Sequence, residues 1–411
     1  MKKRVVITGM GVVSPLGNTV SELWDGMKTG KSGIQTIDWL VEAGSNATVG
    51  GLIKEDINID HLVEPKESRR MDPYARYAIH AADEAIKQSG IDFDKTDRER
   101  VGVIIGSGIG GLQVFSEEHT KLLQKGHRRV SPFFIPMMIP DIAAGYVSII
   151  WGLKGLNFSV SSACATANHA IGLALRSLRY GDADVVIAGA ADATITPIAF
   201  AGFANMKALS QNPNPATASR PFDAERSGFV MGEGSGVFVL ETLEHAEARG
   251  AKILAELSGF GMTGDAYHIT SPAPGGEGAV RAIKQALKDA DVEPTDIDYI
   301  NAHGTSTPAN DKNETKAIKD VFGDYAYQVN ISSTKSMTGH LLGASGGIEL
   351  AATIMALNDN IVPPTINYQN KDEECDLNYT PNKAKEADLH IAMSNSFGFG
   401  GHNAVLVVKK V

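Results

Sequence analysis

The 411-residue chain has a formal net charge of −10, which argues against general nucleic-acid binding, because phosphate binding needs a basic field over the contact surface. Two cysteines, Cys164 and Cys375, are too few for a disulfide framework and lack the paired spacing of a zinc site, so we expect a cytoplasmic protein. The length suggests roughly two to three domains, yet no Pro-rich, Ser-rich or low-complexity linker divides the chain.

The N-terminal segment only superficially imitates a signal peptide. A basic start precedes an apolar run from Val5, but glycines interrupt this run and Pro15 begins a turn where a cleavage site would lie. We predict a first strand and a loop here. Residues 133–153 are the stretch nearest in hydrophobicity to a membrane span, but Pro136, Pro140 and Asp141 interrupt it. We expect a subunit interface or a pocket wall there, and no membrane association.

Two basic clusters stand out in an otherwise acidic sequence. One comprises Lys66, Arg69 and Arg70, and the other comprises Lys121, Lys125, Arg128 and Arg129. Such clusters are either solvated faces or surfaces that dock an acidic protein through complementary charge.

Continuous apolar runs alternate with helical segments along the chain. Apolar runs begin at Val101 and Val185, and the pattern predicts helices over residues 74–88 and 278–290. Strands that are apolar throughout are typical of a sheet buried on both faces. The fold class is therefore predicted to be α/β.

A divergent repeat divides the sequence. The segment Val160-Ser-Ser-Ala-Cys-Ala-Thr-Ala-Asn-His169 aligns with Ile331-Ser-Ser-Thr-Lys-Ser-Met-Thr-Gly-His340 at a constant offset of 171 residues, and a predicted helix and a β-branched run, beginning at Val185 and Ile361, follow each copy. A duplicated α/β unit predicts a pseudo-twofold structure whose equivalent loops meet at the joint, where ligands bind at the carboxyl ends of strands. On this alignment Cys164 corresponds to Lys335.

Cys164 lies where a short strand-like run gives way to a helix. Backbone N–H groups and the helix dipole at a helix N-terminus stabilise a thiolate, so we expect a lowered pKa and a nucleophile. The alternative is a buried structural cysteine. His303 and His340 lie with Lys335 on glycine-containing loops equivalent to the one that carries Cys164, which favours a catalytic constellation over structural histidines. His169 continues directly into a helix, and we interpret it as structural.

Four motifs together resemble a known family: Ser161-Ser-Ala-Cys-Ala-Thr166, Ala302-His-Gly-Thr-Ser-Thr-Pro308, Ser333-Thr-Lys-Ser-Met-Thr-Gly-His-Leu-Leu-Gly-Ala-Ser-Gly346 and Asn395-Ser-Phe-Gly-Phe-Gly-Gly-His-Asn403. They are similar to those of the β-ketoacyl-acyl carrier protein synthases, the condensing enzymes of fatty-acid synthesis, and most similar to the elongating type II class. The resemblance covers essentially the whole chain. Thiolases carry a second cysteine near the C-terminus and initiating synthases carry asparagine in place of the second histidine, whereas here position 340 is histidine and Cys375 lies in an acidic loop.

The resemblance implies a thiolase-like fold of two duplicated α/β halves in a five-layer αβαβα arrangement. We place the halves at residues 1–251, which carry the cysteine, and residues 252–411, which carry the His/Lys/His loops. The implied activity is that of an acyltransferase that loads an acyl chain on Cys164, decarboxylates malonyl-acyl carrier protein and joins the two by Claisen chemistry, extending a fatty acid. The alternatives are a polyketide-type or thiolase-like condensing enzyme with other acyl donors, and a carrier-protein docking subunit that has lost catalysis.

The catalytic roles combine this resemblance with the chemistry of the groups. Cys164 would carry the acyl chain, and neutral His303 and His340 would each donate a ring N–H to the enolate oxygen. Lys335 would hold a histidine or a carboxylate in place. By resemblance, the N–H of Phe399 would join that of Cys164 as an oxyanion donor, and the Phe399 ring would gate the acyl pocket.

The resemblance also implies binding residues. The acyl pocket would be lined by Ile109, Phe134, Ile139 and Phe203, with Phe134 and Ile139 reaching in from the partner subunit of a homodimer. The pantetheine arm would meet Thr270, Ser271, Thr305 and Thr307. Acyl carrier protein, bearing acyl or malonyl groups, would dock on Lys66, Arg69, Arg70, Arg128, Arg129 and Lys207. A monovalent cation would be held by Asn301, Glu349, Ser394 and Asn395, and no other cofactor is required.

Three further features carry interpretations of their own. His402 stands where many relatives carry threonine, and it either is structural or alters the pH response of the loop. Gly106-Ser-Gly-Ile-Gly-Gly111 fits a dinucleotide fingerprint without the required distant acid, so we expect a tight loop near the acyl pocket. Gly343-Ala-Ser-Gly-Gly347 fits an esterase elbow, but no strand runs directly into Ser345, which favours a small-residue entry to a helix.

Overall fold

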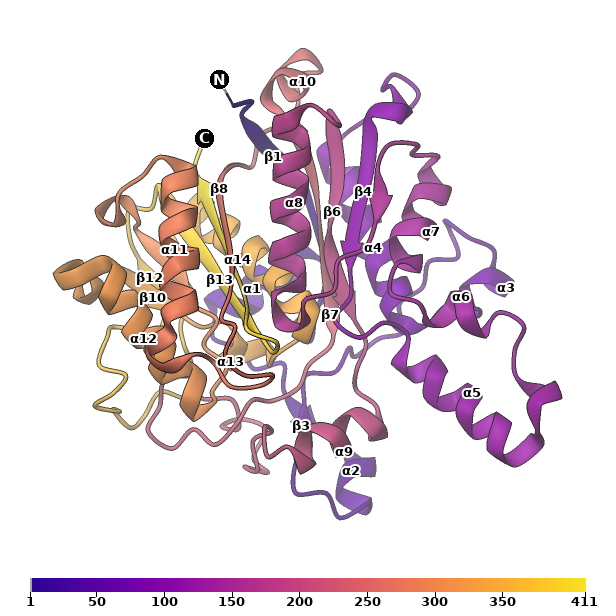
Figure 1. Cartoon of the computed structure of the whole chain (residues 1–411), viewed down its shortest axis with the longest axis horizontal. Coiled ribbons are helices and arrows are strands. Elements are labelled where there is room, and N and C mark those ends of the chain that lie inside the picture. Colours follow the sequence, from indigo (N-terminus) through magenta and orange to yellow (C-terminus); the bar gives the residue numbers. More distant parts are fainter. Residues whose placement is uncertain (1) are drawn as a thin grey trace.

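The computed structural model describes residues 2–411 (Figure 1). Its main sheet has the strand order β10-β9-β13-β14-β8-β1-β7-β6-β4-β5. The strands of the first half are β1 (Val5–Val13), β4 (Val101–Gly106), β5 (Asn157–Phe158), β6 (Val185–Asp192) and β7 (Gly234–Thr242). Those of the second half are β8 (Ala255–Gly264), β9 (Tyr299–Asn301), β10 (Asn330–Ser332), β13 (Ile391–Gly398) and β14 (His402–Lys409). Every residue of β1, β4 and β6 is buried, which confirms the α/β fold expected from the apolar runs.

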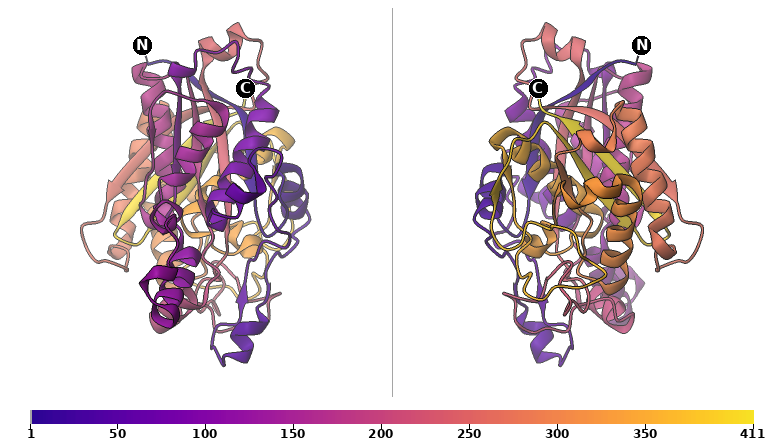
Figure 2. Two further views of the ribbon diagram at one scale, coloured as in Figure 1. Left: turned by 90° about the vertical axis from the view of Figure 1, so that its right-hand side faces the viewer. Right: turned by 90° about the vertical axis from the view of Figure 1, so that its left-hand side faces the viewer.

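The two halves of the sheet have the same strand order when each is followed outward from the joint. The order β1-β7-β6-β4-β5 on one side matches β8-β14-β13-β9-β10 on the other, and the halves join where β1 and β8 pair antiparallel at Val6 and Ile7. Helix α4 (Pro73–Ser89) packs on β1 and β7, as α11 (Glu277–Ala290) packs on β8 and β14. Helices α8 (Thr166–Tyr180) and α14 (Ser345–Asp359) contact each other and strands of both halves. The layers alternate as αβαβα, and the side views in Figure 2 show helices on both sides of the strands.

The duplication is confirmed, but the predicted alignment of the two copies is wrong. Helices α8 and α14 begin at residues 166 and 345, an offset of 179, and each follows a 3-10 turn, η3 (Ala163–Ala165) or η7 (Leu342–Ala344). The counterpart of Cys164 is therefore Gly343 and not Lys335. The offset differs because the connection from β10 to η7 carries an extra short helix, α13 (Lys335–Thr338).

The predicted counterpart of the strand at Val185 is also wrong. The segment at Ile361 forms β11 (Ile361–Val362), which pairs with β12 (Lys385–Glu386) outside the main sheet. The true counterpart of β6 is β13, since each lies third from the joint and each has eight residues. Local sequence similarity pointed to a nearby apolar run, whereas the chain inserts residues between α14 and β13.

Close backbone packing fixes the outer helices in both halves. A Cβ atom on Gly11 of β1 would lie 1.9 Å from the carbonyl oxygen of Ala81 in α4, and one on Gly261 of β8 would lie 2.0 Å from that of Ala282 in α11. Only glycine permits such an approach. The same glycine–alanine contact therefore recurs in the two halves.

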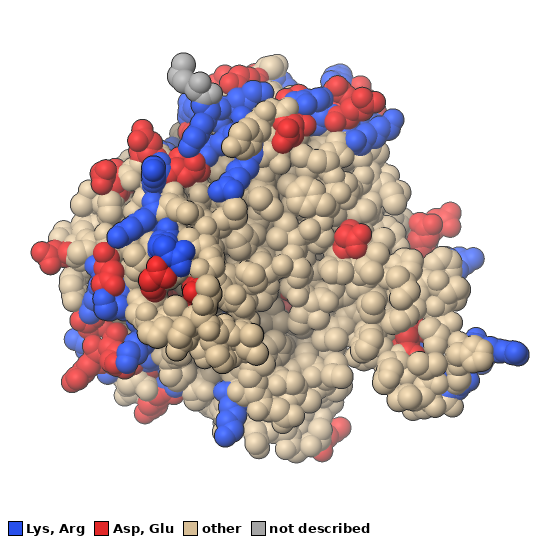
Figure 3. All heavy atoms as spheres, in the orientation of Figure 1, with Lys and Arg blue, Asp and Glu red and all other residues tan. Residues whose placement is uncertain are grey.

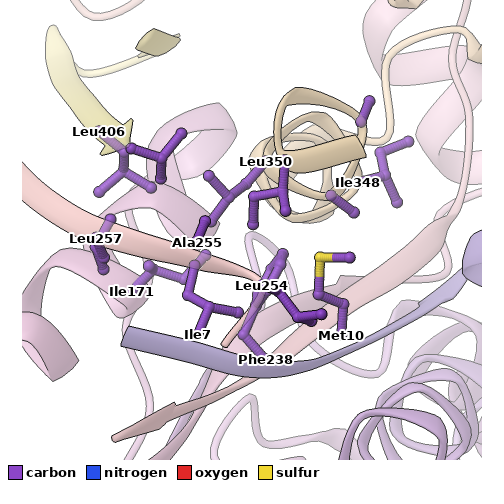
Figure 4. Close-up of a cluster of buried hydrophobic side chains, with 14 of the residues drawn as sticks. Ile7, Met10, Ile171, Phe238, Leu254, Ala255, Leu257, Ile348, Leu350 and Leu406 are labelled. Atoms are coloured by element: carbon purple, nitrogen blue, oxygen red, sulfur yellow. The ribbon is translucent and has the colours of Figure 1, made fainter. Parts of the chain in front are cut away.

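The largest apolar core joins the halves (Figure 4). It combines Ile7 and Phe238 from strands of the first half with Leu406 from β14, and Ile171 of α8 with Ile348 of α14. Burial of apolar surface is the dominant favourable contribution to folding, at about 25 cal/mol per Å². Because one continuous core underlies the joint, the loops at the strand ends are held in a fixed relation.

The remaining elements connect and cover these layers. The helices are α1 (Val20–Lys28), α2 (Asp38–Glu42), α3 (Pro65–Ser68), α5 (Leu112–Lys125), α6 (Phe134–Met138), α7 (Ile142–Trp151), α9 (Pro197–Asn205), α10 (Leu243–Ala248) and α12 (Pro308–Phe322), and the short strands are β2 (Gln35–Thr36) and β3 (Val49–Gly50). Figure 1 shows α5 extending from the layered body as an arm. Within residues 2–411, no helix has both the length and the apolar character needed to cross a membrane.

Candidate active site

A cavity of about 510 Å³ opens where loops of the two halves meet. Its wall includes Cys164 from η3, His303 from the loop after β9, His340 from the segment before η7, and Phe399 from the turn between β13 and β14. Figure 3 shows this face hollowed near its middle, with few charged side chains around the hollow. The structure thus brings four of the five expected catalytic residues to one wall, and the fifth, Lys335, contacts His303 from outside the wall.

Cys164 lies in a turn of unusual backbone conformation. Ala163, just before it, has a φ of 48°, in a region that few non-glycine residues adopt. A Cβ atom on Gly398 would lie 3.0 Å from the backbone nitrogen of Cys164, so the end of β13 lies directly against this N–H group. Glycine at position 398 keeps the space beside the N–H clear.

The pKa of the Cys164 thiol is raised to about 12, so the expectation of a lowered pKa is wrong. Burial is the largest cause, since it disfavours the charged thiolate. The charge of Lys335 and the backbone N–H groups of Phe399 and Cys164 act in the opposite direction. The helix N-terminus was correctly located, but the loss of solvent outweighs it.

His340 faces the thiol directly. Its Nε2 lies 3.0 Å from Sγ of Cys164, and its Nδ1 lies 2.8 Å from Oγ of Ser345. Its backbone is held at both ends, because its N–H donates to the carbonyl of Val230 at 2.7 Å and its carbonyl accepts the N–H of Gly232 at 2.8 Å. Two backbone hydrogen bonds and the contact with Ser345 therefore hold the imidazole against Cys164.

His303 is oriented by Lys335. The ammonium Nζ of Lys335 lies 3.3 Å from Nδ1 of His303, donates to the His303 carbonyl at 2.7 Å, and forms an ion pair with Glu349. An ammonium group can only donate, so Nδ1 of His303 accepts and Nε2 carries the ring proton. Lys335 and Glu349 are both buried. The lysine thus holds both a histidine and a carboxylate.

Both imidazoles are neutral hydrogen-bond donors in this setting. Their rings lie 5.4 Å apart, centroid to centroid, and nearly perpendicular. Burial and then the positive charge of Lys335 hold the pKa of each histidine well below its usual range. Two neutral N–H donors that converge on one buried volume can stabilise an oxyanion.

Sequence reasoning missed two buried acids that support His303. Glu314 of α12 accepts the backbone N–H groups of His303 and Gly304, both at 2.8 Å, and Asp311 accepts that of Thr305 at 3.0 Å. Burial raises the pKa of Glu314 to about 7. The available signal is a pair of acids three positions apart, shortly after the motif Ala302-His-Gly-Thr-Ser-Thr-Pro308.

Six of the eight expected substrate-binding residues line the cavity: Ile109, Phe203, Thr270, Ser271, Thr305 and Thr307. The rings of Phe203 and Phe399 lie 6.5 Å apart, so the turn that carries Phe399 packs beside the part of the cavity wall that Phe203 forms. Phe134 and Ile139 do not belong to the wall within this chain and lie on and next to α6.

The basic residues occupy two places. Arg70 stacks over Phe133 with its guanidinium 4.2 Å from the ring, which brings the cluster at α3 next to the segment that follows Arg128 and Arg129 in η2 (His127–Arg129). Lys66, Arg69, Arg128 and Arg129 are exposed. Lys207 lies apart from them, on the wall of the cavity itself. Folding therefore unites the two sequence clusters and sets Lys207 at the entrance.

The expected cation ligands share an electrostatic feature. Within residues 2–411, no hydrogen bond reaches the buried oxygens Oδ1 of Asn301, Oε2 of Glu349, Oγ of Ser394 and Oδ1 of Asn395. Asn301 and Ser394 are partners in adjacent parallel strands and share a face, and the Asn301 amide donates to the Glu349 carbonyl at 3.1 Å. Asn395, the next residue in the strand, points to the opposite face, where its amide donates to Glu314. Three of the four residues therefore fit a common cation site through their side chains, and Asn395 does not.

The two motifs that resemble a dinucleotide fingerprint and an esterase elbow have the structures expected from the sequence. Gly108 and Ile109 of the glycine-rich loop line the cavity, and Ser345 follows η7 at the start of α14 with no strand running into it. His169 accepts or donates a hydrogen bond with Ser162 at 2.7 Å, as a structural residue would. His402 is exposed at the start of β14, and its ring lies 6.4 Å from that of His169.

Comparison with known proteins agrees with this site. The models of the β-ketoacyl synthase N-terminal and C-terminal domains match residues 2–246 and 254–369. The chain is 53% identical over 408 residues to 3-oxoacyl-[acyl-carrier-protein] synthase 2 of Staphylococcus aureus, with 99% of this chain and 98% of that protein covered. It is 50% identical over 410 residues to the protein of the same name from Synechocystis sp., with 100% and 98% covered.

Solved structures show the same similarity along the full length. A chain from a complex of a type II polyketide acyl-carrier protein with its ketosynthase, bound to a hexaketide, gives a TM-score of 0.92 at 36% identity, with 100% of both chains covered. A β-ketoacyl synthase from Burkholderia phymatum gives the same values.

Proposed function

The chain belongs to the β-ketoacyl synthase family, and we propose that it is an elongating β-ketoacyl-acyl carrier protein synthase of fatty-acid synthesis. The observation that carries this proposal is the approach of His340 Nε2 to Cys164 Sγ at 3.0 Å beside a second buried, neutral imidazole. Such a site suits one covalent acyl carrier and one oxyanion that needs two donors.

The first step is acyl transfer to Cys164. The sulfur attacks the thioester carbonyl of an acyl-carrier protein, and the carrier thiol leaves with the proton that the cysteine gives up. The developing oxyanion accepts the N–H groups of Cys164 and Phe399, the two groups that stabilise negative charge beside Sγ. Since the thiol pKa is raised, the free cysteine is protonated, and we assign its activation to the bound state in which these donors act.

The second step is decarboxylation of malonyl-carrier protein. The carbon–carbon bond to the carboxylate breaks, carbon dioxide leaves, and the electron pair forms an enolate on the thioester. Nε2–H of His303, fixed by Lys335 at Nδ1, donates to the enolate oxygen. Nε2–H of His340 would supply the second bond, and in that tautomer Nδ1 accepts the hydroxyl of Ser345, which lies 2.8 Å away. Their lowered pKa values keep both rings as neutral donors.

The third step joins the two chains. The enolate carbon attacks the acyl carbonyl on Cys164, the new carbon–carbon bond forms, and the bond to sulfur breaks. The Cys164 sulfur leaves as a thiolate and takes up a proton from water, which restores the thiol. The product leaves on the carrier protein, longer by the two carbons that malonyl contributes. The oxyanion of this step again faces the N–H groups of Cys164 and Phe399.

The carrier protein would dock on the basic surface formed by Lys66, Arg69, Arg70, Arg128 and Arg129, with Lys207 at the entrance. Since the chain itself has a net charge of −10, a local positive surface is needed to attract an acidic partner. The pantetheine arm would pass the cavity threonines Thr270, Thr305 and Thr307 and Ser271, and the acyl chain would lie along Ile109 and Phe203. We also propose action in the cytoplasm, in keeping with two free cysteines.

We propose a homodimer that completes the acyl pocket. The edge strand β5 is exposed, and Phe158 in it is 40% accessible, so its unpaired backbone groups and apolar ring invite a second copy. Phe134 and Ile139 lie near this edge on and beside α6, and would enter the partner's pocket. We further propose that the two halves divide at residues 251 and 252, in the connection between α10 and β8.

Asn301, Glu349 and Ser394 would hold a monovalent cation through their uncompensated oxygens, and Asn395 would contribute no side-chain ligand. Oxygen ligands suit a hard cation, and among residues 2–411 no group of three or more His, Cys, Asp or Glu gathers as a divalent metal site would need.

The test is covalent labelling followed by condensation. Incubation with acyl-carrier protein should add the acyl mass to the peptide that contains Cys164, and subsequent malonyl-carrier protein should release a β-ketoacyl product. Cys164→Ala should lose both. Acyl mass on another residue, or normal condensation by the variant, would refute the assignment. Equal activity with malonyl-coenzyme A, or product only with polyketide-type starters, would favour the alternative condensing enzymes.

A further inference from the structure

The counterpart of the Cys164 turn in the second half holds a carboxylate of the protein itself. Cys164 and Gly343 are the middle residues of the turns η3 and η7, which open α8 and α14. The preceding residues, Ala163 and Leu342, have φ values of 48° and 50°. The two turns are therefore copies of one backbone structure, each with an N–H group at the same place.

What faces these two N–H groups differs. Beside the N–H of Cys164 lies Gly398, the last residue of β13. Beside the N–H of Gly343 lies Asp192, the last residue of β6, whose Oδ2 accepts this N–H at 2.7 Å. Since β6 and β13 hold equivalent positions in the sheet, Asp192 stands where Gly398 leaves room for a substrate oxygen.

Asp192 also holds the loop that lines the acyl side of the cavity. Its Oδ1 accepts the hydroxyl of Ser107 at 2.6 Å and the N–H of Gly108 at 3.1 Å, and the N–H of Ile109 lies 3.4 Å away. The side chain is fully buried. All of its partners are donors, so both carboxylate oxygens are needed as acceptors.

The carboxylate is closely packed between the loop and the turn. A Cβ atom on Gly343 would lie 2.7 Å from Oδ2 of Asp192 and 2.7 Å from the backbone nitrogen of Gly108. The loop, the carboxylate and the turn are thus in direct contact. Two residues beyond Gly343, Ser345 contacts Nδ1 of His340.

We propose that Asp192 is a positioning residue for decarboxylation and condensation, whose carboxylate permanently fills the second half's counterpart of the oxyanion hole and so holds the turn that carries Ser345 against His340. This inference rests on the proposed function. It explains why only one of two duplicated turns can accept an acyl oxygen, since the other already binds an anion. The negative charge of Asp192 also raises the pKa of Cys164.

The test is Asp192→Asn, which keeps the size of the side chain but turns an NH₂ group toward at least one donor. Displacement of the turn should loosen His340, and a misplacement of about 1 Å can cost about 100-fold in rate. We expect carbon dioxide release from malonyl-carrier protein and condensation to fall by roughly that factor. The rate of acyl transfer to Cys164, measured by mass spectrometry, should stay within about threefold of that of the unmodified enzyme, because the oxyanion donors of this step lie in the other turn. The pH profile of Cys164 alkylation should move to lower pH, since a negative charge is removed.

The matched control is Glu84→Gln. Glu84 likewise accepts two backbone N–H groups, those of Val12 and Val20, at 2.9 and 2.8 Å, but lies outside the cavity wall. The Glu84→Gln variant should leave the ratio of the two partial reactions unchanged. An equal fall of both partial reactions in the Asp192→Asn enzyme, with an unshifted alkylation profile, would show a merely structural role and overturn the proposal.

Ser345→Ala provides a second test that does not depend on the fold of the first variant. It should reproduce the selective loss of decarboxylation, and in combination with Asp192→Asn the losses should not add, because both act through His340. Fully additive losses, or a Ser345→Ala enzyme with normal decarboxylation, would overturn the proposal. Absence of decarboxylation in the unmodified enzyme would instead refute the proposed function, while the alkylation shift would still report on Asp192.

Discussion

Nε2 of His340 lies 3.0 Å from Sγ of Cys164, although 176 residues separate them in the chain. The pair spans the two halves of a duplicated fold. Cys164 is fixed by the turn before α8 in its own half, whereas His340 is held by backbone bonds to Val230 and Gly232 of the other half. The thiol and the imidazole therefore meet because the apolar core joins the halves rigidly.

His340→Ala should separate the two partial reactions. Loss of one oxyanion donor costs about 100- to 1,000-fold in rate, so release of carbon dioxide from malonyl-carrier protein should fall by that factor. Acyl transfer to Cys164 should survive, because its donors are the N–H groups of Cys164 and Phe399. Radiolabelled carbon dioxide and mass spectrometry measure the two steps. A variant that decarboxylates normally would remove His340 from the enolate site.

Lys335→Ala should be costly for stability as well as for rate. The substitution removes the buried ammonium group that pairs with Glu349, and removal of one partner from a buried ion pair costs about 3–5 kcal/mol. Urea unfolding followed by tryptophan fluorescence would measure this loss. The Lys335→Ala, Glu349→Ala double variant should recover part of the stability, because no unpaired charge then remains. If the double variant lost as much stability as the two single variants together, this account would be contradicted.

Acid should destabilise the protein partly through Glu241, far from the cavity. Its carboxylate is buried among Arg249, His245 and Thr8, and these hydrogen bonds, which outweigh burial, lower its pKa from 4.5 to about 2. A group with a lowered folded-state pKa stabilises the protein above its unfolded pKa and loses that contribution as the pH falls toward the folded value.

We therefore expect Glu241 to contribute about 3 kcal/mol at neutral pH, lost between about pH 5 and pH 2. Denaturant unfolding across this range should show the decline, and Glu241→Gln should be less stable at pH 7 with a flatter acid limb. An acid limb of unchanged slope in the variant would exclude Glu241 as its source.

Charge reversal at Arg128 and Arg129 should affect encounter with the carrier protein and not chemistry. Both side chains are exposed, so their replacement by glutamate should raise the KM for acyl-carrier protein and weaken its dependence on salt, with kcat nearly unchanged. An acyl-pantetheine substrate without the carrier protein serves as the control, and its kinetics should stay the same. Charge reversal at Lys95, which is exposed on another part of the surface, should leave the kinetics with both substrates unchanged.

Sequence patterns alone predict the α/β class, the presence of a duplication, and the loops that carry the Cys, His, Lys and His residues. These follow from local information: apolar runs that must be buried, helix-like segments between them, and motifs whose spacing is preserved. Helix α4 (Pro73–Ser89) and strand β4 (Val101–Gly106) lie where the patterns placed them. The motif residues could be found because each catalytic role demands a particular functional group.

The correspondence of the two copies and the surroundings of each group depend on packing between segments that are distant in the chain. The sequence paired Cys164 with Lys335, whereas α13 lengthens one connection and makes Gly343 the true counterpart. The thiol pKa is raised because burial, which no local pattern reports, outweighs the helix terminus. Glu314 and Asp192 gained their roles in the same way, since a carboxylate becomes a support only when folding brings distant backbone N–H groups to it. Local chemistry named the reacting groups, and packing between distant segments set their protonation and their partners.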